Sequence, residues 1–286
     1  MTVEHTTAVT PPDALGAIAK KIATWRMIPM IVLNEVYKGL LIQWSYKFNM
    51  LMESLMLAFL FLGITFFVGN GQLDPERLAP SLLGYAVWFY ATVAIGTMAY
   101  ALREEAQQGT LEQWYMSPVP PSVVQVGRTL STFVVTTVTL LLIVVPLAWG
   151  FGLAIPWRWS VLPIFVLILI GVYGFGFLVG GATLIFKQVG PLANMVQNMM
   201  LFLNGAFLPV ERFPRWLEGI AHTLPTTDGI LVLQRLLFAD ESLWALWQDG
   251  SLVRLLLNSA VYLVLGLMVF IFTERLAKRR GLLGQY

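Results

Sequence analysis

The sequence predicts an all-α integral membrane protein in which an amphipathic interfacial helix precedes six transmembrane helices. Hydrophobic residues make up 57% of the 286 residues and charged residues only 12%, whereas a soluble domain carries about 25% charged residues. Six apolar stretches each come near the ~20 residues that a helix needs to cross the hydrocarbon core. Because they leave little chain for a soluble domain, we expect one transmembrane domain over residues 27–286, after a cytoplasmic tail over residues 1–26.

The first element that we expect is a helix over residues 27–46, lying in the cytoplasmic interface of the membrane. Its apolar residues recur at helical spacing, and they are Leu33, Val36, Tyr37, Leu40, Leu41 and Trp44. This apolar face would lie in the lipid. A true span is the alternative, but Glu35 and Lys38 near its middle would make that placement costly.

The six predicted spans follow in order, with short connections between most of them. They cover about residues 48–68, 80–102, 124–150, 160–186, 192–208 and 252–272. The fifth is the shortest and the most polar. Five glycines crowd the fourth, and they are Gly171, Gly174, Gly176, Gly180 and Gly181. We interpret them as places where another helix packs closely.

The basic residues predict the orientation, because lysine and arginine concentrate on the cytoplasmic side of membrane proteins. With the amino terminus inside, twelve of them fall on the cytoplasmic side: Lys20, Lys21, Arg26, Lys38, Lys47, Arg103, Arg128, Lys187, Arg275, Lys278, Arg279 and Arg280. Six fall outside: Arg77, Arg158, Arg212, Arg215, Arg235 and Arg254. We therefore expect both termini in the cytoplasm.

A polar stretch over residues 103–118 separates the second span from the third, on the cytoplasmic side. Thr110 and Gln113 form a T-x-x-Q capping box at the start of a short helix. Glu112 lies in the first turn, where the helix dipole favours an anion. Pro118 ends the helix after about two turns. An ordinary loop between spans is the alternative interpretation.

The longest connection, residues 209–251, is expected outside the cell, where it would form a re-entrant helical hairpin. Pro214 to Ile220 has the pattern of a short amphipathic helix. Thr226, Thr227 and Asp228 are suited to cap a second helix over Gly229 to Phe238. That second helix is almost wholly apolar but too short to cross the bilayer, so its backbone must be buried against protein. Three tryptophans suit the outer interfacial belt, and they are Trp216, Trp244 and Trp247.

Several kinds of chemistry are excluded by the residues themselves. The absence of cysteine excludes disulfides and thiolate metal sites. His5 and His222 do not form an H-E-x-x-H site, and nothing fits the nucleotide-binding P-loop. We therefore expect no catalytic residue, metal site or cofactor in this chain. Glu53 is the only acid clearly within a span, either as an ion-coupling site or as an interfacial carboxylate that reaches water or pairs with Lys47.

Two groups of side chains are candidates for a substrate path. The first consists of amides in the fifth span, namely Asn194, Gln197, Asn198 and Asn204, of which 194, 197 and 204 are expected on one face at heptad-like spacing. Because amides in hydrocarbon need partners, they either face a substrate path or hold the bundle or a dimer together. The second consists of Trp88 and Tyr90, with Phe89 between them, which form an aromatic lining or else face the lipid.

The polar stretch resembles the hallmark of ABC-2 type exporter permeases, through its Gly109-Thr110-Leu111-Glu112 core followed by Ser117-Pro118. The outer segment resembles the same family in Phe213-Pro214-Arg215-Trp216-Leu217 and in Leu224-Pro225-Thr226-Thr227. The leading amphipathic helix, the six spans and the outer hairpin agree with this resemblance, which covers most of the chain.

The resemblance implies a membrane subunit of an ATP-binding cassette exporter in a prokaryotic plasma (inner) membrane. Such a subunit pairs with a second copy of itself or a homologous permease, and with two cytosolic ATPase subunits that hold the ATP and magnesium. Region 103–118 would contain the coupling helix that docks on the ATPase. The residues implied in this contact are Glu104, Glu105, Gly109, Thr110, Leu111, Glu112, Gln113, Trp114 and Tyr115. The substrate would be an amphipathic small molecule, a lipid or a glycan, and no nucleic acid is expected.

Two other functions are compatible with the residues. One is a carrier driven by an ion gradient, and the other is a membrane scaffold that transports nothing. Retention of an ATPase that depends on residues 109–115 would separate the exporter from both.

Overall fold

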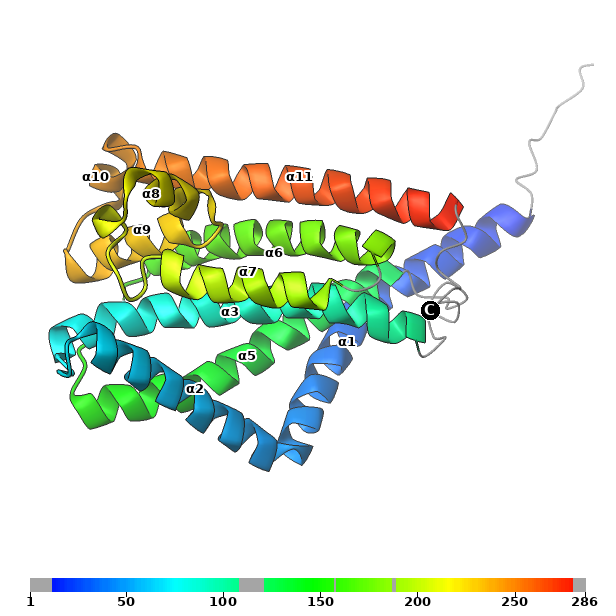
Figure 1. The fold of residues 1–286 in the computed structure, drawn as a ribbon. Coiled ribbons are helices and arrows are strands. Elements are labelled where there is room, and N and C mark those ends of the chain that lie inside the picture. The colour runs from blue at the N-terminus through cyan, green and yellow to red at the C-terminus, as the bar shows by residue number, and fades with distance from the viewer. Residues whose placement is uncertain (1–11, 108–120, 157, 187–188, 280–286) are drawn as a thin grey trace, which may run out of the picture.

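The structure, a computed structural model, describes residues 12–107, 121–156, 158–186 and 189–279. All the regular elements in these residues are helices, as the composition predicts (Figure 1). The long ones are α1 (Pro12–Ser45), α2 (Lys47–Val68), α3 (Pro75–Gln107), α5 (Pro121–Phe151), α6 (Val161–Phe186) and α11 (Ser251–Arg279). The shorter ones are α7 (Gly190–Leu203), η1 (Val210–Arg212), α8 (Arg215–Thr223), α9 (Thr227–Phe238) and α10 (Leu243–Gln248).

Helix α1 begins at Pro12, well before residue 27, where we expected the interfacial helix to start. Proline is favoured in the first turn of a helix, because its missing N–H has no helical partner there. The predicted apolar face points away from the protein, with Leu33 and Trp44 about 70% exposed. Helix α1 ends at Ser45, and after Tyr46 the chain turns through an elbow from which α2 leaves at an angle (Figure 1).

The other face of α1 packs on α5 where small residues let the two backbones approach. A Cβ added at Gly39 would lie 2.0 Å from the Ser131 Oγ of α5. A Cβ added at Gly127 would lie 3.2 Å from the Cβ of Glu35. The side of α1 that carries Glu35 is therefore held by protein, while its apolar side is left for lipid.

Helix α3 occupies the centre and contacts α2, α5, α6, α7 and α9. Its aromatic residues form the core at the end where α2 and α3 meet. The Tyr85 ring lies 5.3 Å from Phe61 and 5.1 Å from Trp88, measured between ring centroids. The Tyr85 hydroxyl donates a hydrogen bond of 3.0 Å to the Leu57 carbonyl oxygen, so α2 is tied to α3 by a polar contact as well as by packing.

The glycines of α6 pack against two helices, which confirms the predicted close packing. Gly174 faces the α11 backbone, where an added Cβ would lie 2.5 Å from the Leu263 nitrogen. On another side of α6, an added Cβ at Gly176 would lie 3.2 Å from the Met98 side chain of α3. Helix α6 therefore joins α3 to α11 as closely packed neighbours.

The predicted fifth span differs from the structure in its length. Helix α7 ends at Leu203, and the chain from Asn204 to Leu208 is irregular. Asn204 caps the helix, and Gly205 follows with a φ of +80°, a left-handed conformation that glycine adopts without strain. The helix is about 21 Å long, shorter than the ~30 Å hydrocarbon core.

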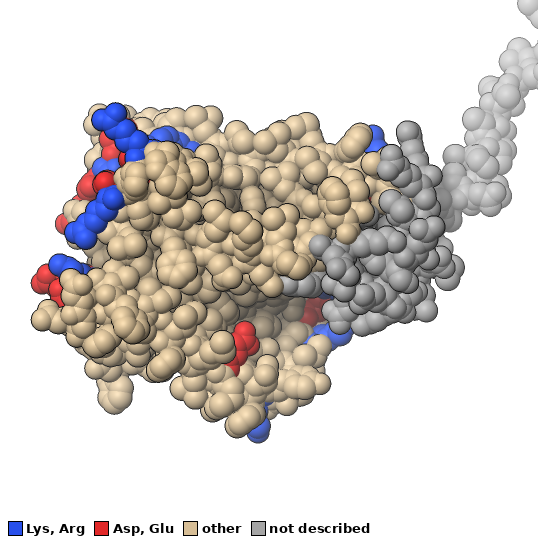
Figure 2. All heavy atoms as spheres, viewed as in Figure 1, with Lys and Arg blue, Asp and Glu red and all other residues tan. Residues whose placement is uncertain are grey.

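Among the described residues, five helices are long and apolar enough to cross a membrane: α2, α3, α5, α6 and α11. Helices α8, α9 and α10 gather at one end of the bundle, hereafter the hairpin end (Figure 1). In the space-filling view, acidic and basic side chains cluster at this end, and a broad uncharged band crosses the middle of the molecule (Figure 2). The band is the surface that a bilayer would cover.

Candidate functional site

The predicted coupling residues Gly109, Thr110, Leu111, Glu112, Gln113, Trp114 and Tyr115 lie outside the described residues. Glu104 and Glu105 belong to the last turns of α3. The carboxyl end of α3 and the amino end of α5 lie together at the end of the bundle opposite α8–α10, where α11 also finishes (Figure 1). Residues 108–120 therefore join two helices that run through the whole bundle.

The candidate path residues Trp88 and Gln197 meet in a buried seam between α3 and α7. The Trp88 Nε1–H donates a hydrogen bond of 2.8 Å to the backbone oxygen of Gln197. The Gln197 Nε2 in turn donates to the Thr92 carbonyl oxygen at 3.1 Å. Both side chains are more than 90% buried. In this chain the pair joins helices, and Trp88 does not face lipid.

The other three amides lie in different surroundings. Asn204 is fully buried, and its Oδ1 accepts a hydrogen bond of 3.0 Å from the Ala206 N–H, while its Nδ2 has no partner among the described residues. Asn194 and Asn198 are exposed. The structure therefore does not bring Asn194, Gln197 and Asn204 to one face, since Gln197 and Asn204 are buried in this chain and Asn194 is exposed.

Tyr90 lies in an aromatic group between α3, α5 and α6. Its ring stacks on Phe133 at a centroid distance of 5.5 Å and meets the Phe165 ring edge to face at 5.2 Å. Its hydroxyl shares a hydrogen bond of 2.7 Å with Thr137. Tyr90 is thus partly buried among side chains of this chain.

A cavity of about 590 Å³ opens at the hairpin end, between the α2–α3 connection and the segment after α7. Its walls include apolar residues such as Phe207 and Leu231, and charged residues such as Glu76, Glu211 and Arg212. This size lies within the range of small-molecule sites. None of the residues predicted for a substrate path lines it.

The connection between α8 and α9 is held along α11 by two polar side chains. The Asn258 Nδ2 donates to the backbone oxygens of His222 at 3.0 Å and Leu224 at 3.4 Å, and the Tyr262 hydroxyl donates to that of Thr223 at 2.5 Å. Asn258 and Tyr262 lie roughly 10–16 Å along α11 from its start, at 1.5 Å per residue. The backbone of the turn therefore receives hydrogen-bond donors from two side chains of α11.

The helix after this turn begins differently from the prediction. Thr226 is the residue that precedes α9, but its hydroxyl makes no capping hydrogen bond. The Asp228 side chain is buried, and its Oδ1 lies 2.7 Å from the Nδ1 of His222. The predicted helix over residues 229–238 is present. Asp228, which we expected to cap it, instead contacts His222 of α8.

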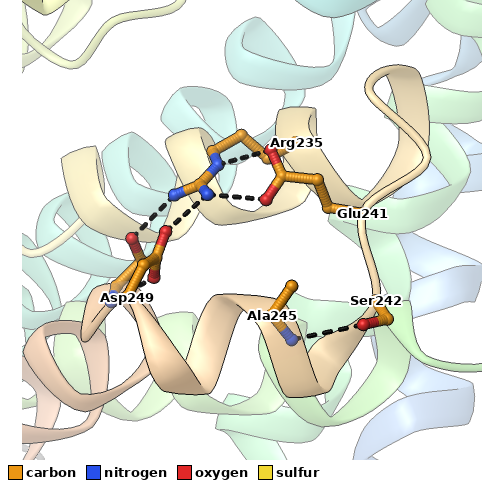
Figure 3. A network of polar contacts seen from close by, with 6 residues as sticks. Arg235, Glu241, Ser242, Ala245 and Asp249 are labelled. Carbon is orange, nitrogen blue, oxygen red and sulfur yellow. Dashed lines mark hydrogen bonds and ion pairs between the residues drawn. The ribbon is translucent and has the colours of Figure 1, made fainter.

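An arginine network joins the far end of α9 to the start of α11 (Figure 3). Arg235 donates two hydrogen bonds to Glu241, from Nε to Oε1 at 2.9 Å and from Nη2 to Oε2 at 2.6 Å. It also pairs with Asp249 and donates to the Ser251 hydroxyl at 2.8 Å. Next to the network, the Ser242 Oγ accepts a hydrogen bond of 3.2 Å from the Ala245 N–H and caps α10.

Charge pairing shifts the acid–base equilibria of this network. The hydrogen bonds to Glu241 are the main cause that raises the pKa of Arg235, and Asp249 adds to it. The hydrogen bond from the Ser251 backbone N–H lowers the pKa of Asp249, and the Arg235 guanidinium lowers it further. Both groups therefore stay charged across the physiological range.

Sequence reasoning missed the Arg235 network, although one feature pointed to it. An arginine within a short apolar helix needs an acidic partner, and Asp240, Glu241 and Asp249 all follow within 14 residues. The sequence alone does not show which of these acidic residues pair with Arg235.

The helices, the uncharged band and the buried seams define a multi-pass membrane protein. Comparison with known families identifies it further. The chain belongs to the ABC-2 type transporter family, because the profile described as "ABC-2 type transporter" matches residues 30–238, well over half of the 286 residues.

Curated relatives are similar over part of their length. A protein named "Probable multidrug ABC transporter permease YbhR" from Escherichia coli (strain K12) is 26% identical over 163 residues, which are 54% of this chain and 43% of the relative. The protein of the same name from Escherichia coli O157:H7 gives the same values. The chain thus spans less than half the length of the curated relatives that it matches.

Proposed function

We propose that the chain is the membrane subunit of an ATP-binding cassette exporter in a prokaryotic inner membrane. It would form a substrate path with a second copy or a related permease, and would couple through residues 103–118 to two cytosolic ATPase subunits that bind ATP and magnesium. The family match over residues 30–238 carries this proposal, because that range includes the polar stretch, α2 to α9 and the hairpin.

The proposed topology has six spans, both termini in the cytoplasm and a re-entrant hairpin outside. Helix α7 together with residues 204–208 would make the fifth crossing. The anchoring of the α8–α9 turn partway along α11 supports a half-inserted hairpin. The predicted excess of lysine and arginine at the opposite end, twelve against six, supports an inside orientation for the polar stretch.

The contacts of α5 suggest how movement would spread from the ATPase. Residues 108–120 lead directly into α5, and α1 packs on α5 at Gly39, Gly127 and Ser131. Close-packed helices move together as rigid bodies. A displacement of residues 103–118 would therefore shift α3, α5 and α1, and it would reach α6 and α11 through the close packing of α6 on α3.

For the cargo we propose an amphipathic molecule, with a small compound favoured over a lipid or a glycan. The mixed apolar and charged walls of the cavity at the hairpin end suit such a molecule. The word "multidrug" in the name of the relatives points the same way. A carrier driven by an ion gradient and a scaffold without transport are the competing functions.

Trp114→Asp tests the proposal, because aromatic residues dominate many interfaces and an aspartate would disrupt an apolar contact with the ATPase. We expect the variant to insert normally and to lose the ATPase during purification, together with substrate-stimulated ATP hydrolysis. The matched control is Trp216→Asp, at an exposed tryptophan of α8, which should retain the ATPase. Retention of stimulated hydrolysis in Trp114→Asp would contradict the docking role.

The orientation is tested separately with single cysteines, since the natural chain has none. In intact cells, a membrane-impermeant maleimide should label Gln248→Cys and should reach Thr110→Cys only after the membrane is opened. Labelling of Thr110→Cys in intact cells would place the polar stretch outside, where no ATPase could bind it.

A further inference from the structure

A second hollow, of about 330 Å³, lies inside the elbow between α1 and α2 and is closed behind by α3 and α5. It is called here the elbow hollow. Figure 1 shows α1 and α2 diverging from this elbow, and in Figure 2 the surface is recessed beside it. Glu53 of α2 lines the hollow, with its exposed side chain at the mouth. Glu53 lies roughly 9 Å along α2 from Lys47, which places it within the proposed inner leaflet.

The back wall of the elbow hollow is a row of hydroxyl groups on α5. Ser131, Thr136 and Thr139 line it and are each more than 90% buried. The Thr136 hydroxyl donates to the Thr132 carbonyl oxygen at 2.7 Å, and that of Thr139 donates to the Val135 carbonyl oxygen at 3.1 Å. Because both hydroxyl hydrogens are donated to carbonyl oxygens of α5, the two hydroxyl oxygens can only accept hydrogen bonds from a molecule in the hollow.

The remaining walls are apolar or neutral. The apolar surface comes from Ile42, Phe89, Val93 and Val135, and Gln43 supplies a side-chain amide. No lysine, arginine or histidine is among the residues that line the hollow in the described part of the chain. The described lining therefore combines one carboxylate and several acceptor oxygens with an apolar wall, and includes no cationic side chain.

We propose that the elbow hollow binds a lipophilic cation, with the charge of the ligand beside Glu53 and its apolar body against Phe89 and Val93. An anion would meet the carboxylate and the acceptor oxygens, and no cationic side chain among the described lining residues would balance its charge. A neutral molecule would gain the apolar contacts but not the ion pair. The site is reached from the membrane, because Glu53 and the neighbouring Ile42 are exposed on the side that faces lipid.

This inference rests on the proposed function in one respect, since it names the class of cargo that the exporter would take up from the inner leaflet. The binding itself needs no ATPase. It is therefore measured on the full chain alone, in nanodiscs of phosphatidylcholine, which carry no net charge. The probes are tetraphenylphosphonium and tetraphenylborate, which have nearly the same shape and opposite charge.

We expect saturable binding of tetraphenylphosphonium, with tetraphenylborate bound at least tenfold more weakly. Glu53→Gln should weaken cation binding about two- to fivefold, as an ion pair open to solvent on one side contributes modestly, and should leave borate binding unchanged or slightly stronger. The matched control is Glu76→Gln, an exposed acid at the hairpin end, which should bind both probes as the natural chain does.

Thr136→Val, which removes one acceptor oxygen at nearly constant volume, is the second variant and should weaken the cation two- to threefold. Equal affinity of the natural chain and both variants for the cation would overturn the proposal, as would preference for the borate. Such a failure would leave docking of the ATPase through residues 109–115 intact, so it is distinguishable from failure of the proposed function.

Discussion

Arg235→Gln tests whether the arginine network joins the hairpin to α11 in a way that matters for stability. The substitution removes the guanidinium that binds Glu241, Asp249 and Ser251. It leaves two carboxylates near each other without the cation that they share. We expect the far end of α9 to separate from the start of α11 at a lower temperature than in the natural chain.

The magnitude follows from the exposure of the network. A hydrogen bond to a charged group contributes about 1.5–3 kcal/mol when buried, and an exposed ion pair about 0.2–1 kcal/mol. The side chains of Arg235 and Glu241 are 36% and 30% exposed, so we expect a loss of about 2 kcal/mol for the whole substitution. At roughly 2–4 °C per kcal/mol, the melting temperature should fall by about 4–8 °C.

The assay is thermal unfolding in detergent, followed by size-exclusion chromatography of the fraction that stays folded. The matched control is Arg254→Gln, an exposed arginine near the start of α11, which should shift the melting temperature by less than about 1 °C. Glu241→Gln and the double variant complete a cycle, with an expected coupling of about 1 kcal/mol between Arg235 and Glu241. Equal melting temperatures for Arg235→Gln and Arg254→Gln would refute the reasoning.

The same measurement has a predicted pH dependence. Because the folded protein lowers the pKa of Asp249, its contribution is present above the unfolded pKa and is lost as the pH falls through the folded value. The raised pKa of Arg235 acts at the other extreme, since its contribution is present below the unfolded value and is lost only in strong alkali. The advantage of the natural chain over Arg235→Gln should be constant from about pH 8 to 5 and shrink below about pH 4.

Two further substitutions test the helix contacts. Gly39→Leu should separate α1 from α5, because the added Cβ would lie 2.0 Å from the Ser131 Oγ. Cross-linking measures this separation: with Gly39 present, a disulfide should form between Glu35→Cys and Gly127→Cys, and with leucine at position 39 it should not. Asn258→Leu should lower the melting temperature by a few degrees, since hydrogen bonds between membrane helices contribute about 0.6–1.7 kcal/mol. An unchanged melting temperature would mean that the hairpin turn does not depend on its contact with α11.

The ends of several helices were predictable because the residues that terminate them stand next to them in the sequence. The predicted spans 48–68 and 160–186 agree with α2 and α6 to within a residue. Gly69 to Asp74 interrupts the apolar run after α2 with glycines and polar residues. The early end of α7 was also encoded, in the pair Asn204-Gly205, but hydropathy alone continued the span to Leu208.

The pairings of the candidate site were not predictable, because they join residues that are distant in the chain. Trp88 and Gln197 were both singled out, yet nothing in their spacing of 109 residues shows that one binds the other. Regular spacing also suggested that Asn194 and Asn204 share a face with Gln197. Gln197 and Asn204 are both buried, but Asn194 is exposed. Spacing alone does not say which part of a helical face its neighbours cover.

Helix α5 links the two proposals of coupling and cation binding. Its first residues follow the stretch proposed to dock on the ATPase, and its hydroxyl groups line the elbow hollow opposite Glu53. If docking moves α5 relative to α2, the hollow must change shape, and its affinity for a cation must change with it. Linkage is reciprocal for equilibrium binding, so a cation in the hollow would then alter the affinity for the ATPase by the same factor. A shared helix is therefore sufficient to connect cargo binding in the elbow hollow to the proposed ATPase, without a separate signalling element.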